Sequence, residues 1–367
     1  MNSQERILTA LRRQQPDRVP VLIFLDPYTS TWAGDDPSYA ALLAATREYA
    51  DVIHDWYFPM GFFASGAPLA RDKQVLADGR TRHTLATPEG PLTMETAPDW
   101  RGEGIVKHWV GSVRDARRLL SIPHAPLRPD LAPFLAERRR LDGMAAAQVT
   151  FPDPIGLVGD LVDPAVLAVW TVEERALLRE MLDVACGRIL EALDYCLAGD
   201  VGPIFYFNGP EYALPPLMSP RDFEEFVVAY DRRLVELVHS RPERYAIIHS
   251  HGRVNRFLDR FAEIGMDGLN VLEPPPVGDT VLAEAKARVG ERFCLIGNIQ
   301  YDDLARGTAE QVEGLVVEAI RQGAPGGGFI LCPCASPYER PLPPKAGDNL
   351  IHYLKMARKH GAYPLRP

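Results

Sequence analysis

Two histidines stand one residue apart at the end of an apolar run, in the stretch YAIIHSHGRV at residues 245–254. The triplet His249-Ser250-His251 follows residues that suit a strand, and Gly252 ends the run. Side chains repeat every two residues along a strand, so both imidazoles should point to the same face. Neutral imidazole is the commonest metal ligand among side chains, and two on one strand end can converge on one ion. The pair therefore predicts a metal site; the alternative is two histidines that only hydrogen-bond.

Other polar residues lie at the ends of further apolar runs. Asparagine and glutamate are rare within apolar strands, so their recurrence at strand exits indicates a polar site more than a set of unrelated loop starts. We expect Glu211 and Glu273 to be catalytic. Asn270 lies at a strand exit with Glu273, without an assigned role. The expected substrate-binding residues are Asp26, Tyr28, Asn208, Tyr212, Asn298 and Tyr338.

Five cysteines, an odd and sparse set, do not describe a disulfide framework. Only Cys332 and Cys334 are close in sequence, and their spacing also puts them on one face of a strand. For Cys332, a buried thiol and a metal ligand remain equal alternatives. Cys334 lies further out along the chain, which favours a role as a ligand.

Apolar runs alternate with amphipathic runs along most of the chain. Continuous apolar runs fit parallel strands that are covered on both faces, and helices between them imply right-handed βαβ units. Eight such units predict a (β/α)₈ TIM barrel formed by residues 1–367 as one domain. An open doubly wound sheet would need an early glycine fingerprint, which the chain lacks. The expected strands are 19–25, 51–58, 144–151, 202–208, 245–251, 268–274, 292–298 and 328–334.

One segment does not fit a strand–helix unit. Threonines alternate around Pro88-Glu89-Gly90-Pro91, which predicts a β-hairpin at residues 82–98 as an excursion from the barrel. Helix boundaries are clear elsewhere: Ser219 and Asp222 form a capping box, as do Thr308 and Gln311.

Charge and hydropathy limit the classes of partner. The formal net charge is −9 and no run of basic residues stands out, which excludes nucleic acid and anionic membrane surfaces as expected partners. No segment approaches about 18 uninterrupted apolar residues. The first twenty residues have scattered charges and no apolar signal-peptide core. We therefore expect a cytoplasmic enzyme with no membrane association.

Several stretches together resemble the uroporphyrinogen decarboxylase superfamily, which includes cobalamin-linked methyltransferases. They are RILTALRRQQPDRVPV, LMSPRDFEEFVVAYDRRLVELV, HSHGRVNRFLDRFAEIGMDGLNVLEP, LIGNIQYDDLARGTAEQVEGLV and GGGFILCPCASPYERPLPP. The resemblance covers nearly the whole chain and implies a (β/α)₈ barrel. The decarboxylases carry an arginine-rich segment after the first strand. IFLDPYTSTW stands there in this chain, without an arginine, which disfavours a porphyrinogen tetracarboxylate as the substrate.

The methyltransferase branch has a zinc signature, His-x-Cys-Gly on one strand and a cysteine after the last. By resemblance, His249 matches its histidine, His251 takes the cysteine position and Cys334 lies near the final cysteine. This implies a zinc site of His249, His251, Cys334 and Glu211, in which Glu211 is either a ligand or a general base. Imidazole in place of thiolate leaves zinc a stronger Lewis acid, which suits polarisation of a substrate oxygen.

The resemblance also implies a homodimer. No Asp-x-His-x-x-Gly corrinoid-binding segment is present, so any corrinoid must be carried by a separate protein. The leading hypothesis is a metal-dependent methyltransferase or demethylase that acts on a small molecule. The alternatives are a decarboxylase or lyase of the same superfamily, acting on a non-porphyrin substrate, and a non-catalytic small-molecule binding barrel.

Overall fold

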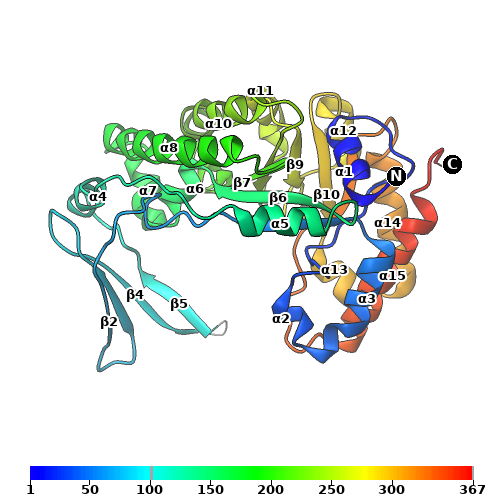
Figure 1. Cartoon of the computed structure of the whole chain (residues 1–367), viewed down its shortest axis with the longest axis horizontal. Helices are drawn as coiled ribbons and strands as arrows, with labels where there is room; N and C mark the ends of the chain where they lie inside the picture. Colours follow the sequence, from blue (N-terminus) through cyan, green and yellow to red (C-terminus); the bar gives the residue numbers. More distant parts are fainter. Residues whose placement is uncertain (100–101, 366–367) are drawn as a thin grey trace.

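The computed structural model describes residues 1–99 and 102–365. Seven strands form one parallel sheet in the order β1-β6-β7-β8-β9-β10-β11, which curls so that helices cover its outer face (Figure 1). The strands are β1 Val52–Tyr57, β6 Ala145–Pro152, β7 Ile204–Asn208, β8 Tyr245–Ser250, β9 Gly268–Val271, β10 Cys294–Ile299 and β11 Phe329–Pro333. Each overlaps an expected strand, and the sequential order confirms the predicted parallel α/β architecture.

The first expected strand, residues 19–25, is not a regular strand. It contributes a single parallel bridge between Val21 and Leu331. Leu331 donates its backbone N–H to Pro20 O at 2.9 Å, and Asp51 donates its own to Val21 O at 2.7 Å. The segment thus lies between β11 and the start of β1 and occupies the eighth position of the barrel. Pro20 has no N–H to give to a ladder, which is one physical reason for the irregular pairing.

Helix α1 (Ser3–Leu11) packs against the side chains that fill the barrel toward the amino ends of its strands. Its apolar residues share one buried cluster with side chains from five of the parallel strands and from the bridging segment. The cluster is Ile7, Leu8, Ala10, Leu11, Leu22, Ala146, Ile204, Tyr245, Ile247, Cys294, Ile296, Ile330 and Cys332. Apolar side chains therefore fill this part of the barrel, and the cavity inside the barrel opens toward the carboxyl ends of the strands.

The helices begin and end largely where local signals indicate. Both predicted capping boxes form, at Ser219 and at Thr308, and Gly265 ends α11 in the left-handed conformation. The remaining helices are α2 Thr31–Gly34, α3 Ala40–Tyr49, α4 Val113–Leu120, α5 Ala132–Arg140, α6 Pro154–Gly159, α7 Pro164–Trp170, α8 Arg175–Ala198, α9 Pro220–Phe223, α10 Ala229–His239, α11 Leu258–Ile264, α12 Leu282–Val289, α13 Tyr301–Arg306, α14 Ala309–Gly323 and α15 Pro344–His360. Short 3₁₀ turns span Pro37–Tyr39, Pro210–Ala213 and Asn255–Phe257, and a π-helical turn spans Glu224–Val228.

The predicted hairpin is present as the centre of a larger antiparallel sheet. β3 (Thr81–Leu85) pairs with β4 (Leu92–Asp99), and β2 (Arg71–Val75) and β5 (Gly102–Lys107) extend it to four strands in sequential order. The sheet follows β1 in the chain and projects away from the barrel (Figure 1). β2 is exposed along its whole length, which explains why apolar alternation did not reveal it.

None of the described helices combines the length and the apolar composition needed to cross a bilayer.

Candidate active site

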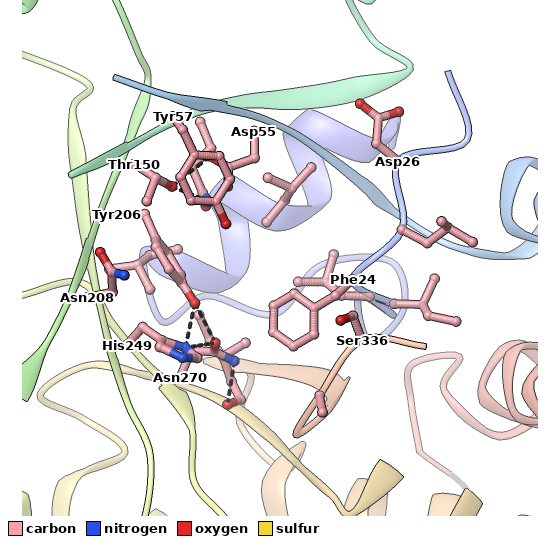
Figure 2. Close-up of a pocket in the computed structure, with 18 of the residues that line it drawn as sticks. Phe24, Asp26, Asp55, Tyr57, Thr150, Tyr206, Asn208, His249, Asn270 and Ser336 are labelled. Carbon is pink, nitrogen blue, oxygen red and sulfur yellow. Dashed lines mark hydrogen bonds between the residues drawn. The ribbon is translucent and has the colours of Figure 1, made fainter. Parts of the chain in front are cut away.

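A cavity of about 550 Å³ opens at the carboxyl ends of the parallel strands, where barrel enzymes place their sites. Inward-facing residues from β1, β6, β7, β8 and β9 form its wall, together with the segments after the bridging strand and after β11 (Figure 2). The lining residues include Phe24, Asp26, Asp55, Tyr57, Gln148, Thr150, Tyr206, Asn208, His249, His251, Asn270 and Cys334.

His249 is held at one nitrogen by two polar neighbours. Its Nδ1 lies 2.6 Å from the Tyr206 hydroxyl and 2.8 Å from Asn270 Oδ1 (Figure 2). The Tyr206 hydroxyl itself donates to Asn270 Oδ1 at 2.8 Å, so Nδ1 is the protonated nitrogen and Nε2 carries the lone pair. Burial, helped by the neighbouring His251, lowers the pKa of His249 to about 4. This imidazole is therefore neutral at physiological pH, which is the form that binds metals.

His251 lies against the first ring and is bonded to a carboxylate. The two ring centroids are 4.6 Å apart with the planes nearly perpendicular. His251 Nδ1 lies 3.2 Å from Glu273 Oε1, and this contact is the main cause of a raised His251 pKa. Gly252 has a φ of +90° and turns the chain so that its N–H donates to Glu273 Oε2 at 2.6 Å. Burial acts to raise the pKa of Glu273, but these two hydrogen bonds outweigh it and the pKa is lowered.

The other two expected zinc ligands do not meet the histidines in a compact cluster. Glu211 is partly buried, its Oε2 has no hydrogen-bond partner, and burial raises its pKa. Cys334 lines the cavity, but its thiol lies 3.8 Å from Val271 O, and burial raises the pKa of this thiol. Within residues 1–99 and 102–365, no three His, Cys, Asp or Glu side chains are grouped closely enough to hold a metal ion. The four-ligand zinc site stays a prediction.

The expected substrate-binding residues separate into two groups. Asp26 and Asn208 line the cavity; Asp26 is bonded to His54 Nδ1 at 2.8 Å and accepts from Thr29 and from the Tyr28 N–H. Tyr28, Tyr212, Asn298 and Tyr338 do not line it. The Tyr212 hydroxyl donates to Asp160 at 2.6 Å, and Tyr338 is exposed beside Tyr301. A place after a strand thus did not distinguish cavity residues from loop residues.

Five polar cavity residues that the sequence reasoning missed lie inside strands: Asp55, Tyr57, Gln148, Thr150 and Tyr206. Asp55 and Tyr57 alternate with outward residues on β1, and Thr150 and Tyr206 face them from β6 and β7. The signal was available: a polar side chain within an otherwise apolar barrel strand, spaced by two from other inward residues, must point into the lumen.

The sequence profile of the uroporphyrinogen decarboxylase (URO-D) family matches residues 138–340, more than half of the chain. The chain belongs to this family. The match spans β6 to the segment after β11, and so includes His249, His251 and Cys334 but neither Asp26 nor Asp55.

Curated relatives include methyltransferases and a decarboxylase. The methylcobamide:CoM methyltransferase MtaA of Methanosarcina barkeri is 27% identical over 181 residues, which cover 48% of this chain and 50% of that protein. The uroporphyrinogen decarboxylase of Trichodesmium erythraeum (strain IMS101) is 29% identical over 114 residues, covering 31% of this chain and 30% of that protein. This chain therefore spans about half the length of the curated methyltransferases that it matches.

A solved structure extends the comparison over the whole fold. A methyltransferase from Methanosarcina mazei superposes with a TM-score of 0.62, at 18% identity, and covers 98% of both chains. At this identity the likeness establishes the shared barrel fold, and it includes the region outside the family match.

Proposed function

We propose that this chain is a metal-dependent methyltransferase that acts on a small molecule, with the corrinoid carried by a separate protein. The observation that carries the proposal is the His249–His251 pair at the mouth of a barrel cavity. The longer match to methyltransferases than to a decarboxylase supports it. A homodimer, which the resemblance implies, and a cytoplasmic location, which charge and hydropathy favour, are part of the same proposal.

The histidine pair suits zinc in the chemistry of its donors. Each Nδ1 is engaged by a polar partner, Asn270 and Tyr206 for His249 and Glu273 for His251, so each Nε2 is left for a ligand. Metal-bound histidines in proteins are oriented in this way by hydrogen bonds at the other nitrogen. Glu211, with an unpartnered buried oxygen, and Cys334 are the proposed remaining ligands. When bound, zinc supplies Lewis acidity that polarises a substrate heteroatom.

The chain's own residues have separable tasks in this proposal. Asn270 and Tyr206 fix the tautomer of His249, and Glu273 orients His251. Glu211 has a pKa raised by burial, which suits a group that holds a proton and gives it to the substrate heteroatom as the methyl group leaves. If Glu211 serves as a ligand, this second task is lost, and the two roles are alternatives.

A decarboxylase acting on a non-porphyrin substrate is the second candidate, because the chain belongs to the decarboxylase family. The lining of the cavity weighs against a substrate with several carboxylates. Among the described residues, neither lysine nor arginine lines it, so such a substrate would have no permanently charged side chain with which to pair each carboxylate.

The test measures methyl transfer from methoxylated and N-methylated aromatic donors to reduced free cobalamin. The change in the visible absorbance of cobalamin reports the transfer. Zinc-loaded protein should methylate the cobalt with at least one donor, and His249→Ala should lower the rate at least a hundredfold. His360→Ala, on the far surface of α15, is the matched control and should keep full activity. Release of carbon dioxide from carboxylated aromatics, without any methyl transfer, would establish the decarboxylase instead.

A further inference from the structure

The cavity wall across from the histidines carries a carboxyl group that the zinc proposal does not use. Figure 2 shows Asp55 and Tyr57 on one side of the cavity and His249 with Asn270 on the other. Asp55 lies on β1 in register with Gln148 on β6, and its Oδ1 accepts a hydrogen bond from Thr150 at 2.7 Å. The carboxyl group is thus fixed in direction and borders the open space.

Asp55 has no cationic partner. No salt bridge to it occurs within the part of the chain that the structure describes, and neither lysine nor arginine contributes to the cavity wall there. The charge of His54 acts to lower the pKa of Asp55, but His54 Nδ1 is already bonded to Asp26 Oδ2 at 2.8 Å. Burial accordingly raises the pKa of Asp55, although hydrogen bonds from Thr150 and Gln148 oppose the shift. A carboxyl group in this position gains most from a ligand that brings a positive charge.

A second unused acceptor lies beside it. Gln148 is 5% exposed, and its Oε1 has no hydrogen-bond partner among residues 1–99 and 102–365. A buried amide oxygen without a partner costs free energy, which a donor group on a ligand would recover. Carboxylate and amide oxygens at one end of a cavity favour a ligand with N–H donors over one with acceptors alone.

Aromatic rings border the same space. Tyr57 is 71% exposed although it lines the cavity, so most of its surface is free for a ligand to cover. Burial is the main cause of the raised pKa of Tyr57, and the charge of Asp55 adds to it, as expected of a hydroxyl two residues away on the same face of β1. Phe24 lines the cavity as well. Aromatic faces attract cations, and a carboxylate beside them strengthens that preference.

We propose that the Asp55 end of the cavity binds a protonated amine, so that the substrate is a small amine whose methylated heteroatom faces His249 and His251. The inference rests on the proposed function for the role of the histidines. The amine subsite itself needs only Asp55, Gln148 and the tyrosine rings. Phosphates, sulfonates and carboxylates are poor ligands for this end, because they would meet Asp55 without any counter-charge.

The experiment compares three probes of nearly equal shape by titration calorimetry on chelator-treated protein at neutral pH. They are 3-methoxybenzylamine, which is protonated, 3-methoxybenzyl alcohol, which is neutral, and 3-methoxybenzoate, which is anionic. A charge-assisted hydrogen bond should make the amine bind about tenfold to a hundredfold more tightly than the alcohol, and the benzoate should not bind. Asp55→Asn should remove the advantage of the amine. Asp142→Asn, which lies outside this cavity, should keep it.

Equal affinities for amine and alcohol in the unaltered protein would overturn the proposal, and so would an Asp55→Asn variant that still prefers the amine. The ranking of probes in the unaltered protein decides the claim even if the variant fails to fold. Because binding is measured without metal and without turnover, amine preference in a protein that never transfers methyl groups would refute the proposed function and leave the subsite standing.

Discussion

The two ends of the barrel each contain a buried carboxylate, and the two carboxylates differ in their hydrogen-bond and charge partners. At the amino end, Asp51 accepts from Arg6 Nη1 and Arg18 Nη1, each at 2.6 Å, and from the Val21 N–H at 3.0 Å. At the carboxyl end, Asp55 has hydroxyl and amide neighbours, and no described lysine or arginine forms a salt bridge with it. The two residues are four positions apart in sequence: Asp51 directly precedes β1, and Asp55 lies within it. One carboxylate is neutralised by the fold, and the other is left for a ligand.

This contrast separates a structural charge from a functional one. A buried charge with a complete set of partners joins elements, here α1, the bridging segment and the start of β1. A partly buried charge without a counter-charge lowers stability and is retained where a ligand can use it. The same distinction applies to Glu211, whose Oε2 has no partner, and to Glu273, whose two oxygens both accept hydrogen bonds.

The largest expected effect on stability is therefore at the amino end. Asp51→Ala leaves the buried Arg18 without its carboxylate and should lower the free energy of unfolding by about 3–5 kcal/mol. Asp55→Asn should change it by less than about 1 kcal/mol, because no ion pair is broken. Urea denaturation at pH 7 measures both. Similar losses for the two variants would mean that Asp55 is structural, and the comparison of the two ends would fail.

A smaller effect on stability is expected from the contact between a histidine and an aspartate at the amino end. His239 Nε2 lies 2.8 Å from Asp267 Oδ2, and this contact raises the pKa of His239. The protonated form is thus favoured by folding, so its stabilisation is present below about pH 6.5 and is lost as the pH rises through the folded-state pKa. His239 is partly exposed, so screening keeps the contribution below about 1 kcal/mol.

His239→Gln tests this directly, through urea denaturation at pH 5.5 and at pH 9. The variant should be less stable than the unaltered protein at the lower pH, and the difference should shrink at the higher one. A difference that grows with pH would contradict the assigned sign.

The fold could be predicted because its signals are local. Apolar runs mark most of the regular parallel strands, and the capping boxes at Ser219 and Thr308 mark helix starts. The irregular segment near Val21 was wrongly expected to be a regular strand, because its apolar composition satisfies burial and says little about hydrogen bonding. The exposed β2 carries no burial pattern at all, so the antiparallel sheet was recognised only through its central hairpin.

The site was less predictable, because a cavity depends on where side chains point. The spacing of His249 and His251 correctly indicated one face, since alternation along a strand is a local property. Position after an expected strand selected Asp26 and Asn208, which line the cavity, but also Tyr212 and Tyr338, which do not. Loop side chains can point in any direction, so this position alone does not identify cavity residues. Asp55 was missed because it lies within a strand that was read only for its apolar character.

The central claim is that the histidine pair binds a metal, and zinc content measures it most directly. Protein purified without a chelator or an affinity tag should hold about one equivalent of zinc by elemental analysis, and His249→Ala or His251→Ala should hold almost none. Cys334→Ser should lose most of its zinc. Cys332→Ser, two residues away in the apolar barrel core, should keep it and lose only stability. Active protein with less than about a tenth of an equivalent of any transition metal, a fraction well below the single site proposed, would contradict the account and leave His249 and His251 as hydrogen-bonding groups of the cavity.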